Sequence, residues 1–151
     1  KTFHGAQRRF DFKIKTDKLV FLSDYAHHPK EIYQSAKSIR ELYKGRHITA
    51  IFQPHLYTRT RDFYRDFADA LSQLDEVILT EIYPAREQPI EGVTSQLIYD
   101  NLRPGIEKSI IRKDDVLDLV KQRDFDVLVI LGAGDLDNYM PQITKIIENK
   151  K

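Results

Sequence analysis

The sequence predicts a three-layer α/β domain: a mostly parallel sheet of about six strands, an antiparallel strand at one edge, and helices on both faces. Short apolar runs alternate along the chain with segments whose apolar residues recur at helical spacing. Runs such as Val127–Leu131 are wholly apolar, as expected of parallel strands covered on both faces. The first run instead alternates apolar and charged residues, which is typical of a half-exposed edge strand. Together these patterns indicate a Rossmann-like architecture.

The chain opens with a predicted hairpin. Phe10, Phe12 and Ile14 alternate with charged residues, and residues 16–18 form a turn into the apolar run at 19–22. A helix is expected from Pro29, with Ile32, Ala36, Ile39 and Tyr43 on its apolar face, and a strand follows over Ile48–Phe52. The next helix has Phe63, Phe67, Ala70 and Leu74 on its apolar face and Thr60 as its cap. The remaining elements are, in order, a strand over 77–82, a short helix near 95–102, a weak strand over 109–111, a helix capped by Asp114 or Asp115, a strand over Val127–Leu131, and a helix beginning near 137–140.

The composition is that of one soluble globular domain: 151 residues, 41% of them hydrophobic and 31% charged. No apolar run approaches the roughly 20 residues that span a bilayer. A net charge of +1 gives no global attraction for nucleic acid or for a membrane surface. The absence of cysteine excludes disulfides and thiolate chemistry. Because the chain begins at Lys1 and its one methionine is Met140, we expect a piece of a longer protein.

Polar segments follow four of the predicted strands, at the edge where ligands bind in open α/β sheets. They are residues 23–29, 53–61, 83–87 and 132–135. The Gly-Ala-Gly sequence at 132–134 could cradle an anion or form a tight turn, but it lacks the third glycine of a dinucleotide fingerprint and follows the last strand. No G-x-x-x-x-G-K-[ST] pattern occurs, so the chain carries no P-loop.

Two of these segments contain charged residues with more than one explanation. Arg59 and Arg61 lie near a helix start, where the helix dipole disfavours cations unless an anion compensates them. They could clamp a carboxylate or phosphate, or they could pair with Asp62 or Asp66 at the surface. Asp24 could bind a ligand or only cap a turn.

A metal site is a further alternative. His27, His28 and His55 with Asp24 offer nitrogen and oxygen ligands on neighbouring loops, from which a metal-dependent hydrolase could be built. Their spacing matches no zinc signature, and adjacent histidines usually diverge. The sequence therefore favours no metal ligand among the candidate site residues.

Five motifs, in order, resemble the Mur ligase family. They are Gly5-x-x-Arg8-Arg9-Phe10, Asp24-Tyr25-Ala26-His27-His28-Pro29-x-Glu31, Phe52-Gln53-Pro54-His55-x-Tyr57-Thr58-Arg59-Thr60-Arg61, Tyr83-Pro84-Ala85-x-Glu87-x-Pro89-Ile90-x-Gly92 and Gly132-Ala133-Gly134-Asp135. The third motif favours the family member that joins L-alanine to UDP-N-acetylmuramate over the member that reattaches a recycled tripeptide. The resemblance places residues 1–8 at the end of an interdomain connection and residues 9–151 in the carboxy-terminal domain of the family.

The resemblance implies an ATP-dependent ligase of peptidoglycan synthesis in the bacterial cytoplasm. Its amino-terminal domain would bind UDP-N-acetylmuramate, and its central domain would hold most of the contacts to ATP and Mg. The domain represented here would close over them, bind L-alanine, and be inactive alone. A carboxylate would be phosphorylated to an acyl phosphate, which the amine of L-alanine then attacks. The alternative is a stand-alone anion- or nucleotide-binding module without catalysis.

The resemblance also implies roles for individual residues. They are His55, Arg59, Arg61 and Arg86 for binding L-alanine, Arg9, Asp24 and Tyr25 for binding the nucleotide, and His27 for accepting a proton or orienting the amine. Many relatives have an arginine directly after the histidine of Gln-Pro-His, where this chain has Leu56. The carboxylate clamp would then contain one cation fewer, unless Arg61 or Arg86 substitutes for it.

Overall fold

The computed structural model describes residues 10–132 and 134–150. The expectations for residues 1–8 and for Arg9 lie outside the described residues. The strands are β1 (Asp11–Lys15), β2 (Val20–Asp24), β3 (Ile48–Phe52), β4 (Glu76–Leu79), β5 (Glu107–Ile110) and β6 (Val127–Leu131). The helices are α2 (Pro29–Leu42), α3 (Tyr57–Leu71), α4 (Gln96–Asp100), α5 (Val116–Gln122) and α6 (Met140–Asn149), with the 3-10 helices η1 (Lys113–Asp115) and η2 (Asp135–Tyr139).

The strands form one sheet in the order β1-β2-β6-β3-β4-β5. β1 pairs antiparallel with β2, and the four other pairs are parallel. The carboxyl ends of the inner strands lie in register, because Leu131 is opposite both Asp24 and Phe52, and Phe52 is opposite Leu79. The predicted mixed sheet with an antiparallel edge is confirmed.

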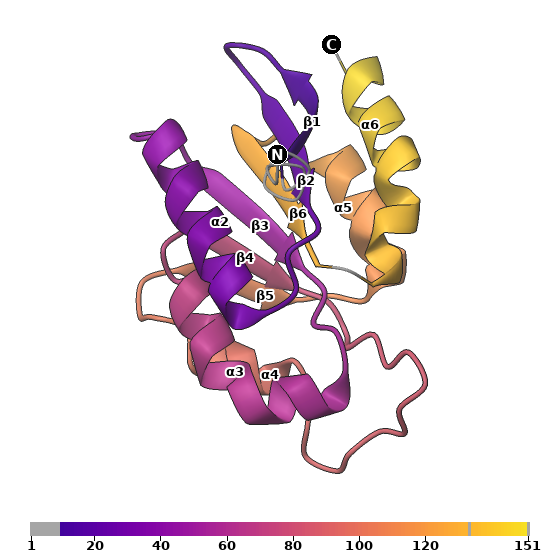
Figure 1. Ribbon diagram of the computed structural model, residues 1–151. Coiled ribbons are helices and arrows are strands. Elements are labelled where there is room, and N and C mark those ends of the chain that lie inside the picture. Colours follow the sequence, from indigo (N-terminus) through magenta and orange to yellow (C-terminus); the bar gives the residue numbers. More distant parts are fainter. Residues whose placement is uncertain (1–9, 133, 151) are drawn as a thin grey trace, which may run out of the picture.

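Helices cover both faces of the sheet (Figure 1). On one face, α2, α3 and α4 pack over alternate strand residues such as Val127 and Val129. On the other, α5 and α6 pack over the intervening residues, such as Leu128 and Ile130. This alternation follows from the period-two geometry of a strand, and it confirms the predicted three-layer arrangement.

The edge strand β1 differs in detail from the predicted alternation. Simple alternation would place Phe10, Phe12 and Ile14 on one face of the sheet. A register shift between Phe12 and Ile14 pairs them instead with the consecutive residues Leu22 and Phe21. Phe12 consequently packs against the core under α2, and Ile14 against the core under α6. An extra residue in an edge strand has this effect, because it reverses the side on which later side chains lie.

The start of α3 was predicted wrongly. Thr60 lies inside the helix, which begins at Tyr57, and its hydroxyl donates to the carbonyl of Leu56 at 2.9 Å. A kink at Phe63 (φ −129°, ψ 16°) turns that side chain outward, so it is 41% exposed. The periodicity assigned Phe63 to the core face, but the kink breaks the regular helical spacing on which that assignment depended.

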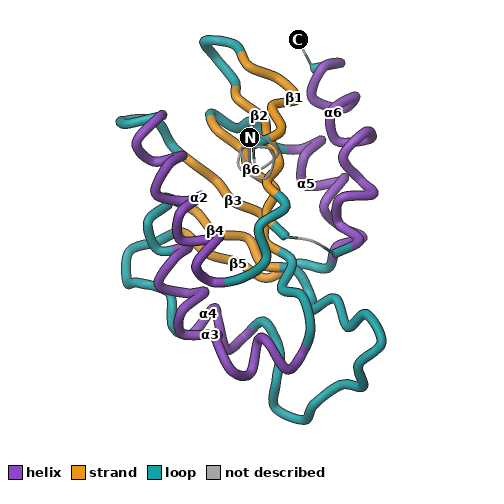
Figure 2. Tube along the Cα trace, in the orientation of Figure 1, coloured by secondary structure: helices purple, strands orange, loops and turns teal. Residues whose placement is uncertain are grey.

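The connections that leave the carboxyl ends of β3 and β4 emerge at the same end of the molecule (Figure 2). β4 ends at Leu79, three residues before the predicted end, and a long loop leads from it to α4. This edge of the sheet carries the candidate site. No described helix combines the length and the apolar character that crossing a bilayer would require.

Candidate functional site

The four polar loops predicted to converge do so at the carboxyl edge of the sheet. The ring of His27, after β2, lies 6.0 Å from that of His55, after β3, measured between centroids. The His55 ring lies 5.4 Å from that of Tyr83, after β4. Gly134, after β6, is so close to Tyr83 that an added Cβ would lie 2.9 Å from the Cβ of Tyr83. One side chain or backbone segment from each loop therefore contributes to a single cluster.

His27 is held in one orientation by acceptors around its Nδ1 atom. Nδ1 lies 3.2 Å from the carbonyl oxygen of Tyr25 and 3.7 Å from a carboxylate oxygen of Glu31. A carbonyl oxygen and an ionised carboxylate can accept hydrogen bonds but cannot donate them, so the neutral ring carries its proton on Nδ1. Nε2 is then left as a hydrogen-bond acceptor.

His55 has the opposite arrangement. Its Nδ1 lies 3.5 Å from Nη1 of Arg59, and a guanidinium only donates. Nδ1 is therefore the acceptor, and Nε2 carries the proton as a donor. Burial, together with the charge of Arg59 and that of His27 when it is protonated, holds the pKa of His55 below its usual range, so the ring is neutral at neutral pH. The two neighbouring histidines thus offer one donor and one acceptor.

Arg61 and Arg86, the other two residues predicted to bind L-alanine, are less closely associated with the histidine rings. Arg61 donates through Nε to Asp62 at 2.9 Å, which is one of the two surface salt bridges considered from the sequence. Arg86 is exposed on the loop after β4. The structure therefore brings Arg59 and His55 together, whereas Arg61 and Arg86 remain outside that pair.

Asp24 and Tyr25 have contrasting environments. Asp24 is 2% exposed, and its carboxylate accepts from the Ala26 N–H at 2.9 Å and from the Ser35 hydroxyl of α2. These bonds fix the turn between β2 and α2. Tyr25 is 61% exposed, with its ring 6.2 Å from that of His27. Its face is thus available for stacking, whereas the nucleotide contact of Asp24 stays a prediction.

Gln53 explains the glycines of the last motif. It is 1% exposed; its Nε2 donates to Asp135 at 2.7 Å, and its Oε1 accepts from the Leu136 N–H at 2.9 Å. A Cβ on Gly134 would overlap Oε1 of Gln53, and one on Gly132 (φ 125°) would lie 2.8 Å from the Gln53 carbonyl oxygen. This packing favours the tight-turn explanation over an anion cradle.

Three charged residues at this edge were not predicted to be important. Glu31 accepts from the backbone amides of His27 and His28, and Glu87 accepts from Thr58 at the start of α3. Lys113 forms an ion pair with Asp135. The capping pattern from His28 to Glu31 is a recognised local signal, but the other two partners are distant in sequence, so no local pattern could identify them.

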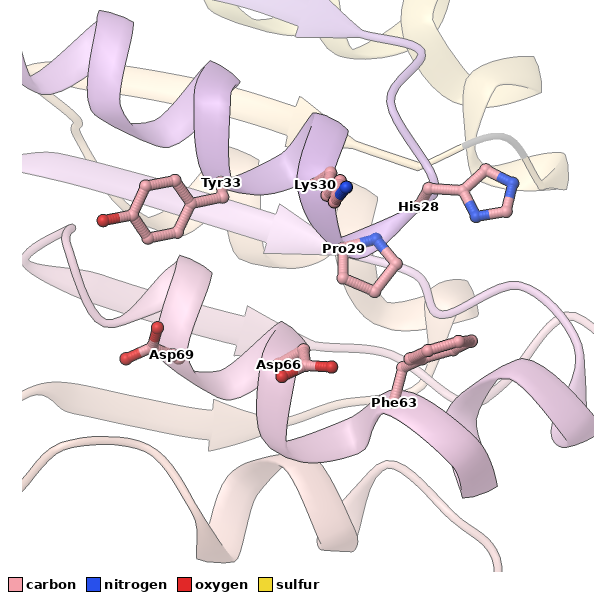
Figure 3. Close-up of a pocket in the computed structure, with 7 residues that line it drawn as sticks. All are labelled: His28, Pro29, Lys30, Tyr33, Phe63, Asp66 and Asp69. Carbon is pink, nitrogen blue, oxygen red and sulfur yellow. The ribbon is translucent and has the colours of Figure 1, made fainter.

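A groove of about 500 Å³ adjoins the site between α2 and α3 (Figure 3). Tyr33 and Phe63 line it with Asp66 and Asp69, and the ring of His28 points away from these side chains. The groove therefore lies beside the cluster of His27, His55 and Tyr83 and does not contain it.

The structure does not support the metal-site alternative. Among the described residues, one group of three offers ligand atoms within 4.8 Å of one another: His47, Glu76 and Glu107. It lies at the other edge of the sheet, where β3, β4 and β5 begin. Both carboxylate oxygens of Glu76 already accept from Arg123, at 2.8 and 2.9 Å. The histidines and aspartate of the predicted loops form no such group.

The fold and the order of these loops are those of a ligase domain. The chain belongs to the family described as "Mur ligase, glutamate ligase domain", whose model matches residues 8–134.

Particular relatives are closely similar. The UDP-N-acetylmuramate–L-alanine ligase of Phocaeicola vulgatus is 67% identical over 149 residues, which are 99% of this chain and 32% of that protein. The solved UDP-N-acetylmuramate–alanine ligase of Thermotoga maritima has a TM-score of 0.72 at 27% identity, over 95% of this chain and 30% of that one. A murein peptide ligase from Psychrobacter arcticus, with a TM-score of 0.74 over 95% of this chain and 30% of that one, is 16% identical and shares the fold. The chain spans about a third of the length of the curated relatives it matches.

Proposed function

We propose that this chain is the carboxy-terminal domain of an ATP-dependent ligase that joins L-alanine to UDP-N-acetylmuramate during peptidoglycan precursor synthesis in the bacterial cytoplasm. Residues 9–151 would form the domain, and residues 1–8 would end its connection to the central domain. The observation that carries the proposal is the 67% identity, across 99% of the chain, to a relative named for that reaction. The paired donor and acceptor at the carboxyl edge of the sheet support a role in holding an amino acid.

The proposed reaction has two steps. The carboxylate of UDP-N-acetylmuramate attacks the γ-phosphorus of ATP, which gives an acyl phosphate and ADP. The neutral amine of L-alanine then attacks the acyl carbon, and inorganic phosphate leaves as the amide forms. The contribution of this domain is to bind L-alanine, to present its amine in a reactive orientation, and to exclude water by closing over the ATP site.

The residues of the cluster suit the two ends of a zwitterionic amino acid. The Arg59 guanidinium and the Nε2–H of His55 both donate, as binding of a carboxylate requires. Nε2 of His27 is an acceptor, so it can take the proton that the ammonium must lose before attack. Arg61 and Arg86 would supply the longer-range positive field in this proposal.

Tyr25 and Asp24 form the proposed nucleotide side, with Arg9. The exposed Tyr25 ring would lie against the base. Mg, with its bound ATP, would supply charge neutralisation at the phosphates. The carboxylates of Glu31, Glu87 and Asp135 are committed to hydrogen bonds within this chain, so we assign the metal to the rest of the protein.

The Asp24 assignment has a direct test. If the carboxylate contacts the nucleotide, Asp24→Asn in the full-length protein raises the KM for ATP by about tenfold, since a charge-assisted hydrogen bond is lost, and leaves the KM for L-alanine nearly unchanged. Unchanged ATP kinetics in a folded variant would restrict Asp24 to its role in the turn.

The proposed function is tested by phosphate release from the full-length protein with ATP, Mg, UDP-N-acetylmuramate and L-alanine. Turnover is expected to require all four, and to cease when L-alanine or the UDP-sugar is omitted. The 151-residue chain alone is expected to be inactive. Turnover by this chain alone, or full-length turnover that is independent of L-alanine, would contradict the proposal. Tight ATP binding by the isolated chain, measured by calorimetry, would instead favour the stand-alone module.

A further inference from the structure

The N-terminus of α3 is capped by a residue from another loop. The helix follows Leu56, which supplies no side-chain cap, and its first turn contains no acidic residue. The N–H and the hydroxyl of Thr58 instead donate to the two carboxylate oxygens of Glu87, the N–H at 3.1 Å. Glu87 lies 29 residues further along, in the loop after β4. It satisfies a first-turn amide that has no acceptor within its own helix.

The same two loops are also joined through their backbones. The Leu56 N–H donates to the Tyr83 carbonyl at 2.8 Å, and the Tyr83 N–H donates to the Pro54 carbonyl at 2.8 Å. Leu56 (φ 77°) and Ala85 (φ 54°) are the two non-glycine residues with positive φ among those described. Residues other than glycine rarely adopt this conformation unless the surrounding structure imposes it. The relative position of the two loops is therefore fixed at several points.

The capped segment links the two donors of the amino-acid site. His55 directly precedes Leu56, Arg59 directly follows Thr58, and their side chains meet at 3.5 Å. We propose that Glu87 is a positioning residue for this site: by fixing the first turn of α3, it holds Arg59 and His55 at the separation that binds the carboxylate of the incoming amino acid. The inference rests on the proposed function and assigns to it a residue that does not itself touch the substrate.

A carboxylate suits this position better than a neutral cap. Arg59 and the helix dipole both place positive charge at the start of α3. The hydrogen bond from the Thr58 hydroxyl holds the pKa of Glu87 below its usual range, so the group is ionised at neutral pH. Removal of Glu87 therefore has two opposed effects: the first turn loses its order, while the positive field that attracts a carboxylate becomes stronger. Glu87→Gln separates them, because its one oxygen can still accept from the Thr58 N–H and its NH2 group can donate to the Thr58 hydroxyl oxygen, but its charge is gone.

The test compares Glu87→Ala and Glu87→Gln in the full-length protein, with Glu91→Ala as the matched control. Glu91 is an exposed glutamate of the same loop. Glu87→Ala is expected to raise the KM for L-alanine by about three- to tenfold, the size expected when a helix cap is lost, with the KM for ATP nearly unchanged. Glu87→Gln should retain a KM for L-alanine close to that of the unaltered protein, and Glu91→Ala should match the unaltered protein.

Hydrogen exchange supplies a readout that does not depend on turnover. Peptides covering residues 56–62 of the full-length protein should lose protection in Glu87→Ala and keep it in Glu91→Ala. Unchanged protection, an unchanged KM for L-alanine, or equal increases in the KM values for ATP and L-alanine would overturn the positioning role. If the unaltered protein lacked L-alanine-dependent turnover, the proposed function would fail. In that case, unchanged protection in Glu87→Ala would overturn the positioning role as well. Lost protection would show that Glu87 orders the first turn of α3, but the positioning of an amino-acid site would be overturned together with the proposed function.

Discussion

Two helices begin at the candidate site, and their N-termini are capped in different ways. α2 caps itself: Pro29 is in its first turn, and Glu31 accepts from the amides of His27 and His28 at 3.1 Å each. α3 begins after a residue with positive φ and depends on Glu87 from the loop after β4. The first cap is local in sequence, whereas the second joins two loops.

The difference follows from the charge that each helix start is proposed to carry. Glu31 lies 3.7 Å from Nδ1 of His27, so the α2 cap is also the anion beside a ring that becomes positive when it takes a proton. The carboxylate of Glu87 also brings a negative charge to the start of α3, but it accepts from Thr58, whereas Arg59 lies against His55. The cap therefore satisfies the backbone of α3 while the Arg59 guanidinium pairs with a neutral ring. The α2 start is thus suited to proton transfer, and the α3 start to anion binding.

The largest expected effect concerns the α2 side. His27→Ala in the full-length protein should lower kcat by about 100-fold, the usual contribution of a positioned general base, and should change the KM for L-alanine much less. Steady-state kinetics at saturating ATP and UDP-sugar provide the measurement. If His27→Ala raised the KM for L-alanine but kept its kcat, it would contradict the proposal that the α2 start serves proton transfer and the α3 start serves carboxylate binding.

The next effect concerns the α3 side. Arg59→Ala should raise the KM for L-alanine by about tenfold or more, because a charged hydrogen-bonded pair in a closed cleft is lost. Arg59→Lys should restore part of the affinity, since an ammonium lacks the planar fork of a guanidinium. The KM values for ATP and for the UDP-sugar should change little.

Alaninamide provides the control for Arg59, because it lacks the carboxylate. It should be a poor substrate for the unaltered protein and should lose little further activity in Arg59→Ala. Equal losses for L-alanine and alaninamide would show that Arg59 does not bind the carboxylate, and would leave it a structural residue of α3.

A smaller effect is expected from the α2 cap. Glu31→Ala should lower the free energy of unfolding of this chain by about 1 kcal/mol, a typical cost for losing a helix cap. Although burial raises it, hydrogen bonds from the amides of His27 and His28 hold the pKa of Glu31 below its usual range. Glu31→Gln, which keeps an acceptor oxygen, should lose less stability in urea denaturation. Equal losses in the two variants would argue against a capping role.

The fold could be predicted where a single local pattern determines an element. The strands Ile48–Phe52 and Val127–Leu131 were predicted with the observed bounds because both are buried runs, the second wholly apolar and the first apolar except for Thr49. The start of α3 was missed because its capping residue, Glu87, lies 29 residues away from Thr58, and no residue near the helix start indicates it. The bulge in β1 was missed because alternation alone cannot show where an extra residue enters a strand.

The candidate site was predicted at the level of loops more reliably than at the level of single contacts. Strand ends in register bring the four loops together, which is a consequence of sheet topology. Which arginine lies against His55 depends on the helical rotation set by the first residue of α3. The resemblance favoured Arg59 with His55 and kept Arg61 as a possible substitute, and in the structure Arg59 lies against His55 whereas Arg61 pairs with Asp62.

The smallest predicted effect is the pH dependence of stability that His55 confers. Burial, with Arg59 and His27 nearby, lowers the pKa of His55 in the folded state, so as pH falls below about 6.5 the unfolded chain takes up that proton first. The stability from the neutral ring is present above the ordinary histidine pKa and is lost as the pH falls through the lowered folded value. His55→Gln cannot take up this proton, so its free energy of unfolding should fall less between about pH 7.5 and about pH 5.5 than that of the unaltered chain. Urea denaturation at the two pH values measures the difference. If both proteins lose stability equally, burial and the nearby charges do not lower the pKa of His55, and the neutral ring proposed to donate at the start of α3 loses that support.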